Sequence, residues 1–309
     1  MPGIDVHQHL WGAPLIEALR GRRTPPYLDG WTLHLAGEPP FEVDPADHDV
    51  AARAALVRAD GLDRALVSLS SPLGVEWLPA DQARPLLEAY HAGAAALPEP
   101  FGSWAAACVS EIDAASLAKD LDRANDLGRG FAGLQLPATA LADRAGYRRC
   151  APLLDVLEER DLPLFVHPGP APAADAEGPG WWPALVPYVS QMHAAWFAFR
   201  AFGRERHPRL RVCFALLAGL APLHGERLAA RGGGRGEVDP NAFVDTSSYG
   251  PRAADAAVRA LGIDVIVHGS DRPYAHPRDL ALGEAAHHAF RVANPHRLLN
   301  GEERTHDAA

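Results

Sequence analysis

Short apolar segments alternate along the chain with longer segments in which apolar residues recur at helical spacing. Several short segments are uninterrupted apolar runs, which are typical of strands buried on both faces of a parallel sheet. The expected strands are residues 3–10, 64–70, 103–109, 130–136, 163–167, 210–216, 242–246 and 263–268. The expected helices include residues 45–59, 82–96, 113–127, 147–160, 188–206 and 251–261. Repeated strand-then-helix units predict a parallel α/β fold, and eight such units predict a (β/α)8 TIM barrel.

Two segments are longer than a minimal barrel requires. Residues 12–44 follow the first expected strand and residues 168–187 follow the fifth, and both are rich in proline, glycine and tryptophan. Each follows the carboxyl end of a strand, where barrel enzymes build their sites and lids. We expect long loops here, either lids over a site or surface loops. With no internal repeat and no linker, residues 1–309 are expected to form a single, distorted barrel domain.

Charge and cysteine usage narrow the range of partners. Acidic residues number 39 and basic residues 29, so the formal net charge is -10. This charge argues against nucleic acid as a partner and gives no support for binding to an anionic membrane. The three cysteines are widely spaced, which argues against a disulfide framework or a zinc ribbon. The first ten residues lack the regions of a signal peptide and no apolar run is long enough to span a bilayer, so a cytoplasmic location is expected.

Lysine usage excludes one group of mechanisms. Lys119 is the only lysine in the chain. It lies in a segment with the pattern of a solvated helix face, whereas Schiff-base and pyridoxal chemistry require a lysine in the site. Neither mechanism is therefore expected.

Candidate metal ligands follow three of the expected strands. His7 and His9 are two positions apart on the first strand, so their side chains point the same way. His167 ends the fifth strand and Asp271 follows the eighth. Because the carboxyl ends of barrel strands meet at one mouth, the four side chains are expected to converge as ligands of Zn²⁺ or a similar divalent ion. Taken alone, the His7–His9 pair has another interpretation, two hydrogen-bonded core histidines.

These motifs resemble the amidohydrolase superfamily, and within it the amidohydrolase-related (amidohydrolase 2) group. Residues 5–9 match the opening D-x-H-x-H of that group, His167 its strand-five histidine and residues 269–273 its closing G-S-D-x-P. Residues 206–212 and 294–299 resemble its E-R-x-P-D-L-R-V and N-A-x-R-L-L segments, so the resemblance covers most of the chain. It implies metal binding by His7, His9, His167 and Asp271. Members are often dimers, so a homodimer is one assembly that the resemblance implies.

The chain departs from the group at one position and from binuclear relatives at another. Leu216 stands where the group usually carries a histidine after strand six, which in mononuclear members contacts substrate or assists catalysis. Gln135 lies on the fourth strand, where binuclear members often place a carboxylated lysine that bridges two metals. The metal expectation is unaffected by Leu216, but the catalytic one is weakened. One metal ion per chain is expected, Zn²⁺ first and Mn²⁺ as the alternative.

The resemblance implies either a metal-dependent hydrolase or a non-oxidative decarboxylase. The first expectation is hydrolysis of a small lactone, ester or amide by metal-activated water, with Asp271 accepting the proton of the water. The alternatives are decarboxylation of a small aromatic or unsaturated acid on the same metal, and a catalytically silent, ligand-binding barrel. The candidates for substrate contact are Trp11, Gln135, Trp181 and Arg272. A packing role for Trp11 and a structural ion pair for Arg272 remain the alternatives.

Overall fold

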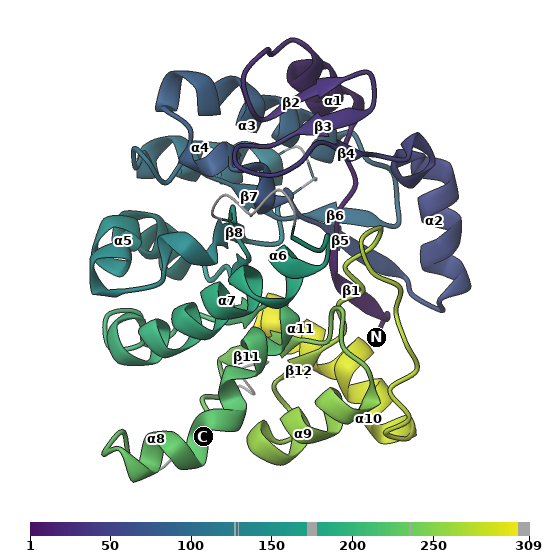
Figure 1. Cartoon of the computed structure of the whole chain (residues 1–309). Helices are drawn as coiled ribbons and strands as arrows, with labels where there is room; N and C mark the ends of the chain where they lie inside the picture. The colour runs from purple at the N-terminus through teal and green to yellow at the C-terminus, as the bar shows by residue number, and fades with distance from the viewer. Residues whose placement is uncertain (127, 129, 172–177, 235–236, 302–309) are drawn as a thin grey trace.

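The computed structural model describes residues 1–126, 128, 130–171, 178–234 and 237–301 (Figure 1). Parallel strands follow one another around its centre in chain order. They are β1 (Ile4–Gln8), β5 (Arg64–Val67), β6 (Phe101–Ser103), β7 (Ala105–Ala106), β8 (Leu134–Pro137), β9 (Leu164–His167), β10 (Val212–Phe214), β11 (Ala242–Asp245) and β12 (Ile266–Val267). Since β6 and β7 share one strand position, the ring has eight positions.

Backbone hydrogen bonds join the two ends of this series. The Val6 amide donates to the His268 carbonyl at 3.0 Å, and the Asp271 amide donates to the His7 carbonyl at 2.9 Å. β1 therefore lies beside the segment that follows β12, and the expected (β/α)8 fold is confirmed.

The third strand differs from the expectation in position. It was expected at residues 103–109, but it spans 101–106 and is interrupted at Trp104. The Trp104 indole donates to the Val6 carbonyl at 2.9 Å, and its ring stacks on Phe165 at 5.2 Å. This large side chain therefore fills the interior of the barrel between strands that are distant in the sequence.

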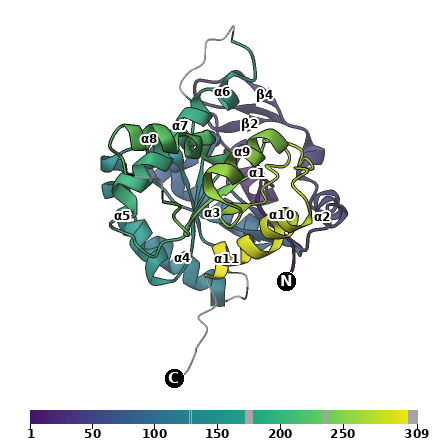
Figure 2. The ribbon, with the colours of Figure 1, turned by 90° about the horizontal axis from the view of Figure 1, so that it is seen from below.

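Helices surround the strands on the outside (Figures 1 and 2). They include α2 (Val50–Ala59), α3 (Ala80–Ala95), α4 (Ala114–Asp126), α5 (Arg144–Glu159), α7 (Pro187–Ala198), α8 (Gly225–Ala230), α9 (Pro251–Leu261), α10 (Glu284–His288) and α11 (Asn294–Asn300). α5 begins three residues before the expected helix because the Asp143 side chain accepts a hydrogen bond from the Gly146 amide and caps its start. Leu127, the expected end of α4, lies outside the described residues.

The segment 12–44 is not the long loop that was expected. It forms α1 (Ala13–Arg20) and an antiparallel sheet of β2 (Tyr27–Asp29), β3 (Thr32–His34) and β4 (Phe41–Glu42). β2 and β3 are joined by a two-residue turn whose first residue, Gly30, has a φ of 61°. Leu28 and Leu33 pair across this hairpin and pack in one apolar cluster with Leu15 and Leu19 of α1, which stabilises the sheet.

The segment 168–187 contains a short helix, α6 (Trp182–Leu185), while residues 172–177 within it lie outside the described part of the chain. Figure 2 shows α6 and β4 on the same side of the molecule. No helix among the described residues is both long enough and apolar enough to cross a membrane.

Candidate metal centre

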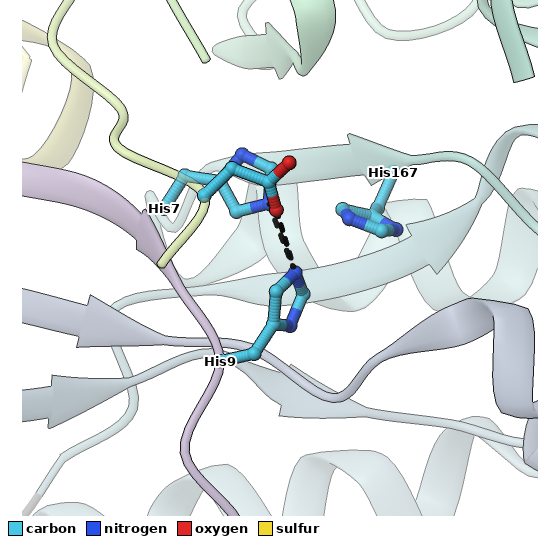
Figure 3. A group of neighbouring side chains, drawn as sticks. His7, His9 and His167 are labelled. Carbon is cyan, nitrogen blue, oxygen red and sulfur yellow. Dashed lines mark hydrogen bonds and ion pairs between the residues drawn. The ribbon is translucent and has the colours of Figure 1, made fainter. Parts of the chain in front are cut away.

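Four side chains converge at the carboxyl ends of the barrel strands. His7 and His9 come from β1 and the residue after it, His167 from the end of β9, and Asp271 from the segment after β12. Their potential ligand atoms all lie within 4.8 Å of one another, and Figure 3 shows the three imidazoles turned toward a common point. His7 Nε2 is 3.1 Å from His9 Nε2, and Asp271 Oδ1 is 3.4 Å and 3.3 Å from these two nitrogens. The structure thus brings together the four residues that the sequence singled out as ligands.

The outer nitrogen of each imidazole faces a hydrogen-bond acceptor. His7 Nδ1 is 2.7 Å from Asp245 Oδ2, His9 Nδ1 is 3.1 Å from the Ser68 carbonyl, and His167 Nδ1 is 2.9 Å from the Pro168 carbonyl. Because carbonyls and carboxylates only accept, each Nδ1 carries a proton and donates it. Each Nε2 is then free to present a lone pair to the centre of the cluster.

Electrostatics in the cluster favour the neutral forms of His9 and His167, the charged form of His7 and an ionised Asp271. Burial lowers the pKa of His9 and of His167, and the charge of neighbouring imidazoles lowers each further. Burial also acts to lower the pKa of His7, but Asp245 and Asp271 outweigh it and raise this pKa to about 8. Burial acts to raise the pKa of Asp271, yet the adjacent histidines bring it down to about 2. Converging nitrogen lone pairs and one carboxylate oxygen fit a divalent cation.

Asp245, at the end of β11, is a functional residue that the sequence reasoning missed. Besides His7 Nδ1, its carboxylate accepts hydrogen bonds from the amides of Leu216 and Ser247, at 3.0 and 2.9 Å, and from the Ser247 hydroxyl. These contacts fix the carboxylate, which in turn fixes the tautomer and orientation of His7. The sequence contains a pattern that could have identified Asp245, because this residue ends an apolar strand just as His167 does.

Asp245→Asn is expected to weaken metal binding by about 10- to 100-fold, because an amide in this place no longer holds the His7 tautomer by a charged acceptor. The measurement is the Kd for Mn²⁺ and Zn²⁺, obtained by competition with a chelator. Asp255→Asn, at an exposed position of α9 where the carboxylate pairs with Arg259, is the matched control. Equal metal affinity in the two variants would show that Asp245 does not position His7.

A cavity of about 760 Å³ opens above the cluster, with His9, His167 and Asp271 in its wall. Most of the remaining wall is apolar or aromatic. It includes Leu33, Leu35, Phe41, Leu73, Trp182, Leu185, Tyr188, Val189, Leu216, Tyr249 and Tyr274. The candidate metal centre is therefore open on one side to a space large enough for an organic ligand.

No protein-family model matches the chain, and no curated protein sequence matches it. Solved structures match over almost the whole length. IDCase from Metarhizium anisopliae, in apo form, is 18% identical over 98% of both chains with a TM-score of 0.78. 5-Carboxyvanillate decarboxylase from Novosphingobium aromaticivorans, with bound manganese and 3-methoxy-4-hydroxy-5-nitrobenzoic acid, is 18% identical over 96% of this chain and 97% of that chain, with a TM-score of 0.71.

A 2,6-dihydroxybenzoate decarboxylase complexed with 2,6-dihydroxybenzoate is 18% identical over 97% of this chain and 99% of that chain, with a TM-score of 0.69. The chain has the fold of IDCase and of these two decarboxylases. Other matching structures are described as amidohydrolases. The fold that the resemblance implied is thereby confirmed.

The segment after β10 has an unusual backbone conformation. Residues 216–220 all have positive φ, including 55° at Leu216 and 47° at Leu217, although only position 219 is a glycine. Left-handed backbone costs a non-glycine residue roughly 1–2 kcal/mol. The two acceptors of the Leu216 amide, on Asp245 and Ser247, hold the start of this segment in place. As a result the Leu216 side chain enters the cavity wall, at the position where the related motif has histidine.

The two tryptophans expected to contact substrate lie outside the cavity wall. Trp11 is buried, donates its indole N–H to Ser70 Oγ at 3.3 Å and stacks on His48 at 4.5 Å. Trp181 is 59% exposed, and the adjacent Trp182 lines the cavity in its place. A contact between substrate and either Trp11 or Trp181 stays a prediction.

The two polar candidates are engaged with other residues of the chain. Arg272 pairs with Asp60 at 2.8 Å. This is the structural ion pair expected from the sequence as the alternative to substrate contact. Gln135 is fully buried and donates its amide to Ser71 Oγ and to Glu76 Oε1. Neither residue is in the described cavity wall, and their contact with substrate also stays a prediction.

The buried cluster of Gln135, Ser71 and Glu76 predicts a pH-dependent contribution to stability. Burial raises the pKa of Glu76 from 4.5 to about 7. A carboxyl group whose pKa is higher in the folded state stabilises the fold below pH 4.5 and loses that contribution as the pH rises through 7. Glu76→Gln cannot ionise. Its free energy of unfolding, relative to the parent, is therefore expected to rise by about 3 kcal/mol between pH 4.5 and 8.

Urea unfolding of both proteins across this pH range measures the difference. Glu88→Gln, at an exposed position of α3, is the control, and its free energy of unfolding should equal that of the parent at every pH. A difference between Glu76→Gln and the parent that stays constant with pH would contradict the prediction.

Proposed function

We propose that the chain is a metal-dependent, non-oxidative decarboxylase of an aromatic acid and a member of the amidohydrolase-related group. The observation that carries this proposal is the convergence of three imidazole nitrogens and one carboxylate oxygen at the floor of a largely apolar cavity. A divalent ion bound there supplies the positive charge that holds the acid group of the substrate. The names of the matching structures, most of them decarboxylases of carboxylic acids, support the same reaction class.

In this reaction the bond between the substrate carbon and its carboxyl group breaks, the electron pair stays on the carbon, and a proton takes the place of CO2. Asp271 is the residue at the cavity floor that can handle this proton. Its lowered pKa means that it enters the reaction ionised, so it first takes a proton from the substrate or from water and then delivers it to the carbon. Ser248 donates to Asp271 Oδ2 at 3.0 Å and orients the carboxylate.

The apolar wall of the cavity favours a reaction that removes the charge of the substrate carboxylate. A carboxylate loses hydration when it enters a cavity lined by residues such as Leu216 and Tyr249. Once the carbon has been protonated, both products, CO2 and the protonated body, lack this charge and do not suffer this loss, so the wall favours them over the bound acid.

Hydrolysis of a lactone, ester or amide, the first expectation from the sequence, is the second candidate. It is favoured by the same Asp271, which could accept a proton from water, and by the matching structures described as amidohydrolases. The decarboxylase alternative has the better support, because the matching structures named for a reaction are mostly decarboxylases.

One divalent ion per chain, Mn²⁺ or Zn²⁺, completes the proposal. Three imidazoles and one carboxylate are acceptable ligands for both ions, and manganese is bound in one of the matching structures. Reconstitution of metal-free protein with each ion, followed by the assay below, compares the two.

The test is CO2 release from a panel of hydroxybenzoic acids, run beside a panel of lactones, esters and amides. Decarboxylation of at least one acid by the metal-loaded protein is expected, together with exchange of a ring hydrogen of the product in D2O, which is the reverse proton transfer. Hydrolysis without CO2 release would establish the second candidate. Neither reaction with bound metal would establish a silent, ligand-binding barrel.

A further inference from the structure

The cavity is much larger than a single-ring acid needs. A space of about 150 Å³ accommodates one benzene ring, whereas this cavity measures about 760 Å³. The candidate metal centre occupies only one part of its wall, with His9, His167 and Asp271. An acid held there by its carboxylate leaves most of the space for the rest of the substrate.

The charge in the remaining wall has one sign. Among the described residues that line the cavity, none is arginine or lysine. Glu38 is the only acidic residue there besides Asp271, and its carboxylate accepts a hydrogen bond from the Ala171 amide. A second carboxylate on the substrate would meet no cation in this wall, and it would be repelled by Glu38.

The mouth of the cavity is apolar. Phe41 on β4, and Trp182 and Leu185 on α6, line the cavity and are also 52%, 46% and 59% exposed. Residues that belong to both the wall and the surface mark the opening, and Figure 2 shows β4 and α6 on the same side of the molecule. Large exposed apolar side chains gathered at an opening are typical of a surface that a ligand covers.

We infer that the substrate is a monoacid whose single acidic group is held at the metal centre and whose uncharged, apolar body of at least two rings reaches the mouth between β4 and α6. A substrate with a second anionic group on that body is rejected by Glu38 and by the lack of a cation in the described wall. The inference rests on the proposed function for the place of the acidic group, and it adds the size, polarity and charge of the rest.

The experiment measures binding, so that it does not depend on turnover. Calorimetric titration of Mn²⁺-loaded protein compares 2-hydroxybenzoate, 3-hydroxy-2-naphthoate, 4-phenyl-2-hydroxybenzoate and the same biphenyl acid with a second carboxylate on its outer ring. The Kd is expected to fall by roughly 10- to 100-fold with the second ring, because about 100 Å² of apolar surface is buried. The second carboxylate is expected to cancel this gain. Equal affinity for one-ring and two-ring acids would overturn the inference, as would equal affinity for the biphenyl acid and its diacid.

Variants locate the effect in the structure. Glu38→Gln is expected to narrow the gap in Kd between the diacid and the biphenyl acid, and Trp182→Ser with Leu185→Ser is expected to remove the preference for two rings over one. Leu223→Ser, an exposed leucine outside the cavity wall, is the matched control and should keep that preference. An unchanged preference in the Trp182→Ser, Leu185→Ser protein would refute the placement of the apolar body.

The two proposals fail separately. Tight binding of extended monoacids without CO2 release would refute the decarboxylase and leave the inference intact. Efficient decarboxylation confined to single-ring acids or diacids would support the decarboxylase and refute the inference about the size and charge of the substrate.

Discussion

Asp271→Asn is expected to lower kcat for decarboxylation by about 1,000-fold, while the protein still folds and still binds metal. The amide resembles the carboxylate in shape and keeps one oxygen that can face the three histidines, but it cannot carry the proton to the substrate carbon. Proton transfer by a positioned side chain contributes about 10²- to 10⁴-fold to a rate. The measurement is the rate of CO2 release from the best acid of the panel, together with the metal content of the same sample.

Asp264→Asn provides the control for this prediction. Asp264 is exposed and precedes β12, whereas Asp271 follows it, so the two carboxylates lie at opposite ends of one strand. The control should keep its kcat. Full activity in Asp271→Asn would show that the proton comes from another group.

A double variant, His7→Ala with His9→Ala, is expected to lose its metal and with it all activity. Loss of a residue that merely orients a ligand weakens metal binding by about 10- to 100-fold, and this variant removes two of the four ligands themselves. Mass spectrometry of the purified protein should find about one ion per chain in the parent and almost none in the variant.

The control is a second histidine pair of the same geometry. His193 and His224 also contact edge to face, with ring centroids 5.1 Å apart, as are those of His7 and His9. Neither belongs to the metal-ligand group among the described residues. Replacing both by alanine should leave the metal content unchanged. A parent protein that binds no metal even after reconstitution would overturn the catalytic proposal.

The barrel could be predicted because its determinants are local and repeated. Each buried strand is an apolar run, each helix has an amphipathic period, and eight units in series have few other arrangements. The sheet of β2, β3 and β4 could not be predicted in the same way. Its strands have only two or three residues, and Leu28 and Leu33 are stabilised by packing on α1 rather than by a period along the chain.

The candidate ligands could be predicted because each lies at or just past the carboxyl end of an apolar strand, and the fold alone brings such positions together. Trp11 and Arg272 were candidates for substrate contact because they lie close to ligands in the sequence, and such proximity does not show which residues a side chain contacts. Trp11 comes two residues after His9, yet its ring stacks on His48 and bonds to Ser70 Oγ, and Trp11 is not among the residues of the cavity wall. Glu38 was missed because it comes from the irregular segment after β3, whose path depends on tertiary contacts that no periodicity encodes.

The closure of the ring also has a consequence for the order of events in biosynthesis. The amide of Ser270 donates to the Asp5 carboxylate across 265 positions of sequence, beside the candidate ligands His7 and Asp271. During synthesis, His7 and His9 leave the ribosome long before Asp271 is made. The nascent chain therefore cannot bring all four candidate ligands together until β12 has left the exit tunnel. Contacts of such separation form late in folding. The candidate metal site can therefore be complete only after β12 has been made, and a chain that stops before β12 lacks Asp271.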